Sequence, residues 1–156
     1  MQIVRFYVGG QQYAIDIMQV KEIITPVRIV SVPSAPDFVE GIIELRGAFL
    51  PIVDVRKRFG LTPAATTRES KYIIANLSGQ NVALIVDAVL DVRRIALADI
   101  ESTPALARSG DERQSFVVGL ARWDDEIAML VDLGRILSDS ERDTLQHDVE
   151  PSRGSH

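Results

Sequence analysis

Residues 38–60 read FVEGIIELRGAFLPIVDVRKRFG, and this segment is the most informative one for predicting the architecture. Residues 42–46 are mostly apolar and typical of a β-strand, the Gly-Ala pair at 47–48 can turn, and residues 49–53 return as a second strand. Pro51 has no backbone N–H to donate to a neighbouring strand, so the return strand is predicted to lie at an edge or to bulge there. The segment therefore predicts a β-hairpin.

A short helix is predicted on each side of this hairpin. Ser34 and Asp37 resemble a capping box at a helix start, and Gly41 provides a C-terminal stop. Asp54 stands at the N-cap position of a second helix over residues 55–59, with a glycine directly after it. The predicted order is helix, strand, turn, strand and helix.

The preceding residues are also rich in strand signals. Residues 3–17 alternate apolar and polar side chains around a Gly-Gly pair at 9–10, which predicts another β-hairpin. Residues 18–24 are predicted as a helical turn, and residues 27–32, bracketed by two prolines, as a short strand. Residues 62–70 (TPAATTRES) are polar and are the best candidate for a boundary between two lobes.

The same pattern then starts again. A strand at 71–77 precedes GQNVAL (79–84), which overlays GQQYAI (10–15), so that Val89 falls on Val20 and Val92 on Ile23. Further on, FVVGLARWDDEIAMLVDLGRIL (116–137) overlays the stretch that begins at Phe38, and the second copy has a longer middle, predicted as a loop over 102–114. Two copies of a strand-rich unit predict two small antiparallel barrels. The alternative is a chance likeness between β-hairpins.

The C-terminal part is predicted to be helical and then flexible. Ser138 and Glu141 form a capping box. Residues 148–156 are polar and predicted as a flexible tail, and their last part, SRGSH (152–156), is typical of an expression-tag remnant. The single predicted domain therefore spans residues 1–147.

Composition limits the classes of function. The 156 residues suffice for one domain or two small lobes with a shared core. The chain has no cysteine, which excludes a disulfide scaffold and suits a cytoplasmic protein. Its formal net charge of −5 argues against nucleic acid or an anionic membrane as a partner. No apolar run approaches the roughly 20 residues of a membrane span, and no basic leader of a signal peptide is present.

The sequence offers little chemistry for an enzyme. The two histidines, His147 and His156, lie near the end of the chain, and the motifs of hydrolases, phosphate loops, dinucleotide sites and zinc proteases are absent. The acidic run 124–126 is read as a solvated hairpin turn rather than a metal site. Asp54 and Asp132 hold equivalent positions and are read as helix caps. No catalysis is predicted, and the surplus of apolar residues points to binding other proteins.

At the central segment the sequence resembles a known family. The signature of CheW-like chemotaxis coupling proteins closely resembles FVEGIIELRG followed by LPIVDVR (38–56). The family's first hairpin and the segment that follows it are similar to YAIDIMQVKEI (13–23). The resemblance spans about residues 4–137. It implies an all-β fold of two intertwined five-stranded SH3-like barrels with short connecting helices and a C-terminal helix, in agreement with the internal repeat. No phosphotransfer, ATPase or receiver segment accompanies it, so the stand-alone adaptor is the closest match.

The resemblance also implies partners. The family joins the cytoplasmic tips of chemoreceptors to a CheA-type histidine kinase, through the kinase's own CheW-like regulatory domain, at membrane-associated arrays in the cytoplasm. It implies neither a cofactor nor a metal. The residues that match the family's receptor-binding groove between the barrels are Glu22, Gly41, Arg46, Val86, Val89 and Val92. Those that match its kinase contact on the outer strands of the first barrel are Val4, Ile17 and Val20.

Several of these residues also have a structural interpretation. Val4 and Ile17 lie on the apolar faces of predicted strands and read as core. Val86 at a strand end is either buried or at the rim of a groove. Val89 and Val92, three apart, are compatible with one apolar stripe on a helical turn.

The polar candidates need separate weighing. Glu22 alone reads as a surface charge and Gly41 as a helix C-cap. Arg46 is the most informative, because an arginine in an apolar strand must reach solvent or a partner. The family usually has Asn where this chain has Glu44, which would share a strand face with Arg46. The predicted ion pair between Glu44 and Arg46 would either hold the guanidinium or compete with a receptor carboxylate for it, and would tune the site.

A second class of function stays open at this stage, namely an SH3-like module that binds nucleic acid or a small ligand. The acidic net charge and an aromatic content of only 6% argue against nucleic acid, because phosphate contacts and stacking platforms are both scarce. The sequence does not distinguish a flagellar pathway from pilus motility.

Overall fold

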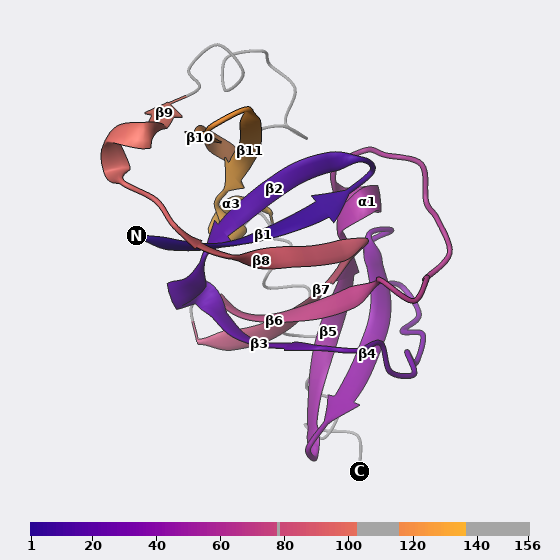
Figure 1. Ribbon diagram of the computed structural model, residues 1–156. Helices are drawn as coiled ribbons and strands as arrows, with labels where there is room; N and C mark the ends of the chain where they lie inside the picture. The colour runs from indigo at the N-terminus through magenta and orange to yellow at the C-terminus, as the bar shows by residue number, and fades with distance from the viewer. Residues whose placement is uncertain (78, 103–115, 137–156) are drawn as a thin grey trace.

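The chain forms two β-sheets that pack against each other (Figure 1). This computed structural model describes residues 1–77, 79–102 and 116–136. One sheet has six strands in the order β8-β1-β2-β11-β10-β9, and the other has five in the order β3-β6-β7-β5-β4. The elements are β1 (Gln2–Val8), β2 (Gln11–Asp16), the 3₁₀ turn η1 (Ile17–Gln19), β3 (Val20–Ile24), β4 (Val39–Leu45), β5 (Ala48–Asp54), α1 (Val55–Arg58), β6 (Lys71–Leu77), β7 (Gln80–Val86), β8 (Ala88–Arg94), the 3₁₀ turn η2 (Leu97–Asp99), β9 (Ile100–Ser102), β10 (Val117–Trp123), β11 (Glu126–Val131) and α3 (Leu133–Ile136).

The two copies of the repeat exchange strands. The first copy contributes β1 and β2 to the six-stranded sheet and β3, β4 and β5 to the five-stranded sheet. The second copy does the reverse, because β6 and β7 join the five-stranded sheet while β8 and the later strands join the six-stranded one. Parallel contacts between β2 and β11 and between β7 and β5 link the copies within each sheet. The predicted all-β fold of two intertwined barrels is therefore confirmed, and the short β9 adds a sixth strand to one of them.

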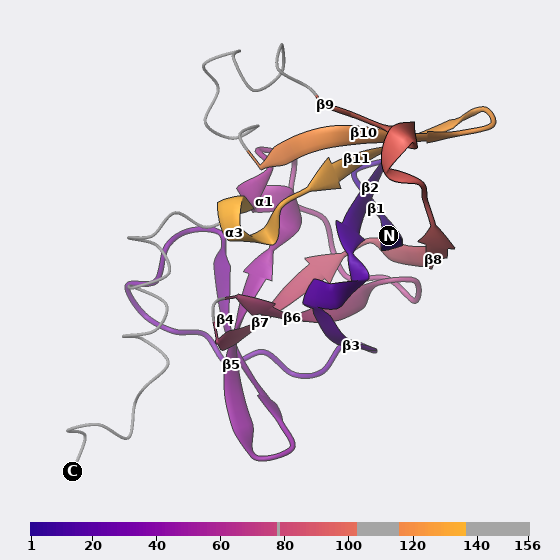
Figure 2. The ribbon, with the colours of Figure 1, turned by 90° about the vertical axis from the view of Figure 1, so that its left-hand side faces the viewer.

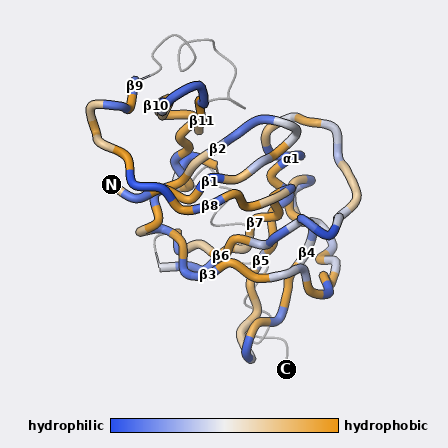
Figure 3. The backbone as a smooth tube through the Cα atoms, in the orientation of Figure 1, coloured by the Kyte–Doolittle hydropathy of each residue, from blue (hydrophilic) through white to orange (hydrophobic). Residues whose placement is uncertain are grey.

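Three apolar cores follow from the period-two alternation of the strands. In β1, Val4, Phe6 and Val8 face a core shared by the two sheets, whereas Ile3 faces the core of the six-stranded sheet. The five-stranded sheet has its own core, which includes Ile43. Hydrophobic residues accordingly follow the strands of both sheets, and hydrophilic residues gather at hairpin tips (Figure 3). Burying one such aliphatic or aromatic side chain contributes about 1.5–3 kcal/mol.

Equivalent turns end the second hairpin of each copy. The backbone N–H of Asp54 donates to the carbonyl oxygen of Phe38 at 2.8 Å, and that of Asp132 donates to Phe116 at 2.9 Å. The carboxylate of Asp54 accepts a hydrogen bond from the N–H of Arg56 at 3.0 Å, and that of Asp132 accepts one from Gly134 at 2.9 Å. Both aspartates thus begin short helices, as predicted from their matched positions in the repeat.

The helix predicted just before the central hairpin is wrong. Val39 already belongs to β4, and the strand bulges between Val39 and Gly41. Gly41 has φ 149°, and a Cβ at this position would lie 2.1 Å from the carbonyl oxygen of Val30. The glycine is therefore required by a strand bulge and a close backbone approach, not by the end of a helix.

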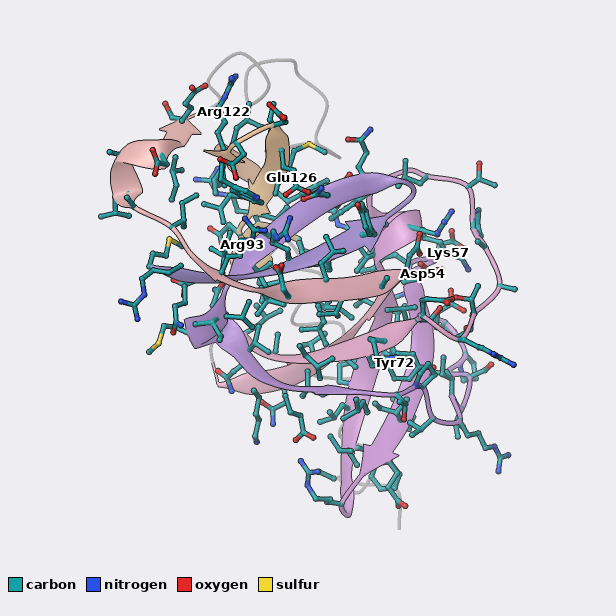
Figure 4. All side chains as sticks on the ribbon, in the orientation of Figure 1. Asp54, Lys57, Tyr72, Arg93, Arg122 and Glu126 are labelled. Atoms are coloured by element: carbon teal, nitrogen blue, oxygen red, sulfur yellow. The ribbon has the colours of Figure 1, made fainter. Side chains whose placement is uncertain are left out.

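The strand predicted over residues 27–32 is reduced to a single bridge. Val30 and Ile42 exchange two backbone hydrogen bonds of 2.9 and 2.8 Å. Before the bridge the segment departs from β4, and the hydroxyl of Tyr72 donates to the carbonyl oxygen of Val27 at 3.1 Å (Figure 4). This departure leaves a surface pocket of about 360 Å³ lined by Val27, Arg28, Val30, Ile42, Glu44 and Phe49.

Three further predictions have definite outcomes. The helical turn predicted over 18–24 is limited to η1, and the rest of that segment is strand β3. β5 is an internal strand, but its ladder with β7 begins only at Ile52, so Pro51 lies where no donor to β7 is needed. Residues 62–70 contain no helix or strand, as expected for a connection. The predicted loop over 102–114, the C-terminal helix from Ser138 and the tail at 148–156 lie almost wholly outside the described residues.

Candidate partner-binding surfaces

Arg46 lies in the turn between β4 and β5 and not within a strand. Arg46 and Gly47 have φ values of 49° and 83°, the left-handed conformations of a tight two-residue hairpin turn. The side chain is 66% exposed and donates a hydrogen bond to the carboxylate of Glu22 on β3. This hydrogen bond lowers the pKa of Glu22. The predicted pair with Glu44 is wrong, because the turn takes Arg46 out of the strand alternation that the prediction assumed.

A pocket of about 190 Å³ adjoins this ion pair. Its apolar walls include Leu50 and Ile74, and its charged rim includes Lys21. The β4–β5 hairpin that carries the pocket extends away from the core, as the β10–β11 hairpin does elsewhere in the molecule (Figure 2). The structure thus brings two predicted residues, Glu22 and Arg46, together at an accessible hairpin tip.

Val89 and Val92 lie on one face of an edge strand because of a bulge. Residues three apart in a regular strand point to opposite faces. In β8 the register shifts, so that Val89 pairs with Phe6 and Val92 with Val4, and both partners face the shared core. Val92 is 47% exposed. The expectation that the two valines share a face holds, but the structure behind it is a β-bulge and not a helical turn.

The edge strand of the other sheet repeats this arrangement. In β3 the register shifts between Val20 and Glu22, and Val20 pairs with Ala75 while Ile23 pairs with Ile73. Both partners belong to the shared core. Ile23 is 37% exposed and was not among the predicted site residues. Ile23 is equivalent to Val92 in the repeat, and this equivalence could have identified it as a candidate contact residue. The two edge strands cross the front of the molecule in Figure 1, with β8 above β3.

Three of the predicted contact residues are buried. Val4 is 1% and Val86 0% exposed, and both belong to the shared core. Gly41 is buried in its bulge against Val30. The interpretation of Val4 as core is confirmed, and the alternation of the strands accounts for it. The sequence left open whether Val86 is buried or lies at the rim of a groove, and its burial shows that it belongs to the core.

The turn η1 presents an apolar side chain that the sequence did not single out. The carboxylate of Asp16 accepts a hydrogen bond from the N–H of Met18 at 2.9 Å and thereby caps the turn. Met18 is 86% exposed, whereas its neighbours Ile17 and Val20 are half-buried against the shared core. The sequence signal for an exposed apolar residue here was a capping aspartate followed by two apolar residues. On a short turn only one of two adjacent side chains can pack inward, so the other is exposed.

An ion pair at the other end of the molecule joins several connections. The guanidinium of Arg56 binds the carboxylate of Asp87 with distances of 3.0 and 2.6 Å and also donates to the carbonyl oxygen of Thr62 at 2.9 Å. The N–H of Gly9 donates to the same carboxylate at 2.8 Å. Burial disfavours the ionised form of Asp87, but these hydrogen bonds outweigh it and lower its pKa. The node is structural, since it ties α1 to loops of both copies.

The acidic run 124–126 is divided between two roles. Asp124 and Asp125 form the turn between β10 and β11, as predicted. Glu126 instead accepts hydrogen bonds from the indole N–H of Trp123 at 3.0 Å and from the amide of Gln12 at 3.2 Å.

Within the described residues, no group of three or more His, Cys, Asp or Glu side chains is placed to hold a metal ion. In the same residues, no helix is long and apolar enough to cross a membrane.

Comparison with known proteins identifies the family. The model of the CheW-like domain matches residues 2–141. The chain belongs to the CheW-like family. Its relatives include the chemotaxis protein CheW of Rhizobium meliloti, 36% identical over 142 residues that cover 91% of this chain and 90% of that protein. The probable chemotaxis protein CheW of Rhizobium etli is 33% identical over 140 residues, 90% of this chain and 89% of the relative.

The CheW-like fold is confirmed by a solved structure. The scaffolding protein TtCheW from Thermoanaerobacter tengcongensis superposes with a TM-score of 0.81 at 35% identity, covering 90% of this chain and 94% of that one. Members of the family are scaffolding proteins of chemotaxis, in agreement with the prediction of a non-catalytic adaptor.

Proposed function

We propose that this chain is the cytoplasmic adaptor that couples chemoreceptor tips to a CheA-type histidine kinase at membrane-associated arrays. The single observation that carries the proposal is the exposed Arg46–Glu22 pair, which stands at a hairpin tip beside an edge strand with partly exposed apolar residues. An exposed ion pair contributes little to stability, so its arginine can exchange one carboxylate for another at small cost. A receptor carboxylate is the partner that fits this exchange.

For the receptor surface we propose Arg46, Glu22, Val89 and Val92, together with Ile23. A helical receptor tip offers apolar side chains at i, i+3 and i+4, which match apolar residues presented along a partly covered surface. On the side of the shared core, β8 presents Val89 and Val92, and β3 presents Ile23. Gly41 and Val86 are buried and are not part of this surface.

For the kinase surface we propose Ile17, Met18 and Val20. Exposed apolar side chains on a well-ordered turn are typical anchors of a protein–protein contact, because they fill pockets of the partner on binding. Met18 projects from η1, and Ile17 and Val20 pack beneath it. Val4 lies in the shared core and acts on this surface only through its packing.

Reconstitution of the ternary complex tests the function. The purified chain, a receptor-tip fragment and a kinase regulatory domain from the same organism should co-elute in size-exclusion chromatography, with the chain required for receptor and kinase to elute together. Elution of the chain apart from both partners at concentrations well above micromolar would contradict the adaptor role.

A further inference from the structure

Arg5 is a buried charged side chain of the six-stranded sheet, covered by Asp91 and Glu126, which are themselves partly exposed. Its side chain is 5% exposed, and the equivalent position in the other copy of the repeat is occupied by the apolar Ile74. Its Nε and Nη2 atoms bind the two carboxylate oxygens of Asp91 at 2.7 and 2.5 Å. Its Nη1 atom donates to Gln12 at 3.0 Å and to Glu126 at 3.4 Å. A buried arginine with this many partners is fixed in one position.

The neighbours of Arg5 come from four strands. Its guanidinium lies 5.0 Å from the centre of the Trp123 ring, and that of Arg93 lies 5.4 Å from the same ring. Arg93 also approaches Asp91 at 3.5 Å and Glu126 at 3.9 Å. Figure 4 shows Arg93 and Glu126 on the same part of the molecule, above β8. The cluster therefore connects β8 to β1, to β2 and to the β10–β11 hairpin.

The Arg5–Asp91 pair coincides with the bulge of β8. The register shift lies between Arg5 and Phe6, because Arg5 pairs with Asp91 while Phe6 pairs with Val89, which leaves Leu90 as the extra residue. A bulge that moved by one residue would reverse the faces of the residues between its old and new positions. The two-pronged bond between Arg5 and Asp91 matches the observed register, because the Arg5 guanidinium is buried and Asp91 stands directly opposite it.

The bulge of β3 provides the internal comparison. Glu22 holds the position in β3 that Asp91 holds in β8, and it too binds an arginine. Its partner, Arg46, comes from an exposed hairpin tip, where the second copy has Asp124 instead. The two pairs differ in their arginines, because the Arg5 side chain is 5% exposed and that of Arg46 66% exposed, whereas both carboxylates reach solvent. The exposed arginine is free to exchange partners, and the buried one is not. The two equivalent acidic residues thus have different tasks.

We propose that Arg5 is a positioning residue for the receptor-binding surface, which through Asp91 holds the bulge that places Val89 and Val92 on one face. Arg5 itself contacts no partner. That the two valines bind a receptor rests on the proposed function. That Arg5 holds the register of β8 does not depend on it.

Three variants separate positioning from stability. Arg5→Ile copies the residue of the other repeat and leaves Asp91 without its main partner. Arg5→Ile combined with Asp91→Asn removes both charges of the pair, so an unpaired Asp91 carboxylate no longer contributes to the result while the bulge stays without its bond. Arg46→Ala is the matched control for amide exchange only, because it acts on the equivalent pair of β3 and should leave the exchange of β8 unchanged; its receptor affinity is no control, since Arg46 is itself a proposed receptor contact. Amide hydrogen exchange of β8 and β3 is measured alongside affinity for the receptor-tip fragment and for the kinase regulatory domain.

We expect amide exchange in Leu90–Val92 to accelerate about tenfold in the single and double variants of Arg5, with β3 changed less than about twofold. Receptor affinity should fall about tenfold in both, while kinase affinity stays within about twofold. Unchanged exchange in β8, an equal acceleration in β3, or recovery of receptor affinity in the double variant would overturn the proposal. Normal receptor binding by Val92→Asp would instead overturn the proposed function. Amide exchange in β8 distinguishes this failure from a failure of the positioning role, because it reports on the strand register without any partner.

Discussion

Phe59 and Phe116 stack in the shared core, with ring centroids 4.0 Å apart and planes inclined by 9°. Phe59 follows α1 in the first copy of the repeat, and Phe116 precedes β10 in the second. Tyr13 adds a third ring, 4.8 Å from Phe59. Aromatic pairs of this kind contribute beyond their buried area. The stack joins the two copies within the shared core, so we expect the intertwined barrels to unfold as one cooperative unit.

We expect Phe116→Ala to lower the free energy of unfolding by about 3–5 kcal/mol, because it opens a cavity in the shared core and removes the stack. Chemical unfolding followed by tryptophan fluorescence and by circular dichroism should give one coincident transition for the wild type. Phe49→Ala is the control, since Phe49 is about half exposed and lies outside the shared core, so its loss should cost far less than that of Phe116. Two separate transitions, one for each barrel, would contradict the shared core.

We expect Arg46→Ala to weaken receptor binding while the fold and the kinase affinity are retained, because its ion pair is exposed and its removal leaves no buried charge. Titration calorimetry with the receptor-tip fragment measures the loss. Arg46→Lys should recover only part of it, since an ammonium group lacks the planar fork that binds a carboxylate with two bonds. Glu44→Ala is the control for a nearby charge that does not pair with Arg46. If Arg46→Ala binds as tightly as the wild type, Arg46 is not a receptor contact.

We expect Val92→Asp and Val86→Asp to differ sharply. Val92 is partly exposed on the edge strand, so an aspartate there remains solvated and should abolish receptor binding in a folded protein. Val86 lies in the shared core, where an unpaired carboxylate is strongly unfavourable, so this variant should unfold. Circular dichroism separates the two results. A folded Val86→Asp variant that lacks receptor binding would return Val86 to the contact surface.

We expect Met18→Asp to weaken binding of the kinase regulatory domain about tenfold or more without weakening receptor binding, because the side chain is exposed on η1 and is a candidate anchor. Surface plasmon resonance with each partner in turn provides the comparison. Leu97→Asp is the matched control, since Leu97 is also a strongly exposed apolar residue on a 3₁₀ turn. Equal losses for both variants would indicate a general effect of surface charge rather than a contact at Met18.

Most of the strands could be predicted from the local sequence pattern, but the order in which they pair could not. Alternation and the internal repeat were enough to predict both hairpins of each copy and the capping roles of Asp54 and Asp132. The exchange of strands between the sheets followed only from the family resemblance, which implied intertwined barrels, because alternation shows which face of a strand is buried and not which strand lies beside it. A glycine with positive φ serves equally in a helix cap and in a bulge, which is why Gly41 was misread.

The candidate site was harder to predict for the same reason. The bulge that brings Val89 and Val92 to one face depends on Arg5 and Asp91, which are 86 residues apart in the sequence. Arg46 looked like part of a strand, and the left-handed turn instead directs it to Glu22. Register depends on contacts distant in sequence, so the local pattern alone gave Arg46 and the two valines the wrong local structure.

Asp87 and Asp54 should give stability opposite dependences on pH. Burial opposes ionisation of Asp87, but hydrogen bonds from Arg56 and Gly9 lower its pKa below the ordinary 3.8. Its contribution is therefore fully present above the unfolded pKa and is lost as the pH falls through the folded pKa. Burial raises the pKa of Asp54 above 3.8. Its contribution is present below that value and is lost as the pH rises through the folded pKa.

We therefore expect Asp54→Asn to be more stable than the wild type at about pH 7 and to lose this advantage near pH 3, because asparagine keeps the helix cap without a buried charge. Asp87→Asn should be less stable than the wild type at neutral pH and should show a shallower loss of stability in acid. Urea unfolding across this range measures both. Asp54→Ala is the control for the cap and should be destabilised at every pH. An Asp54→Asn variant whose deficit grows as the pH rises would mean that the carboxylate stabilises the folded state, contrary to its raised pKa.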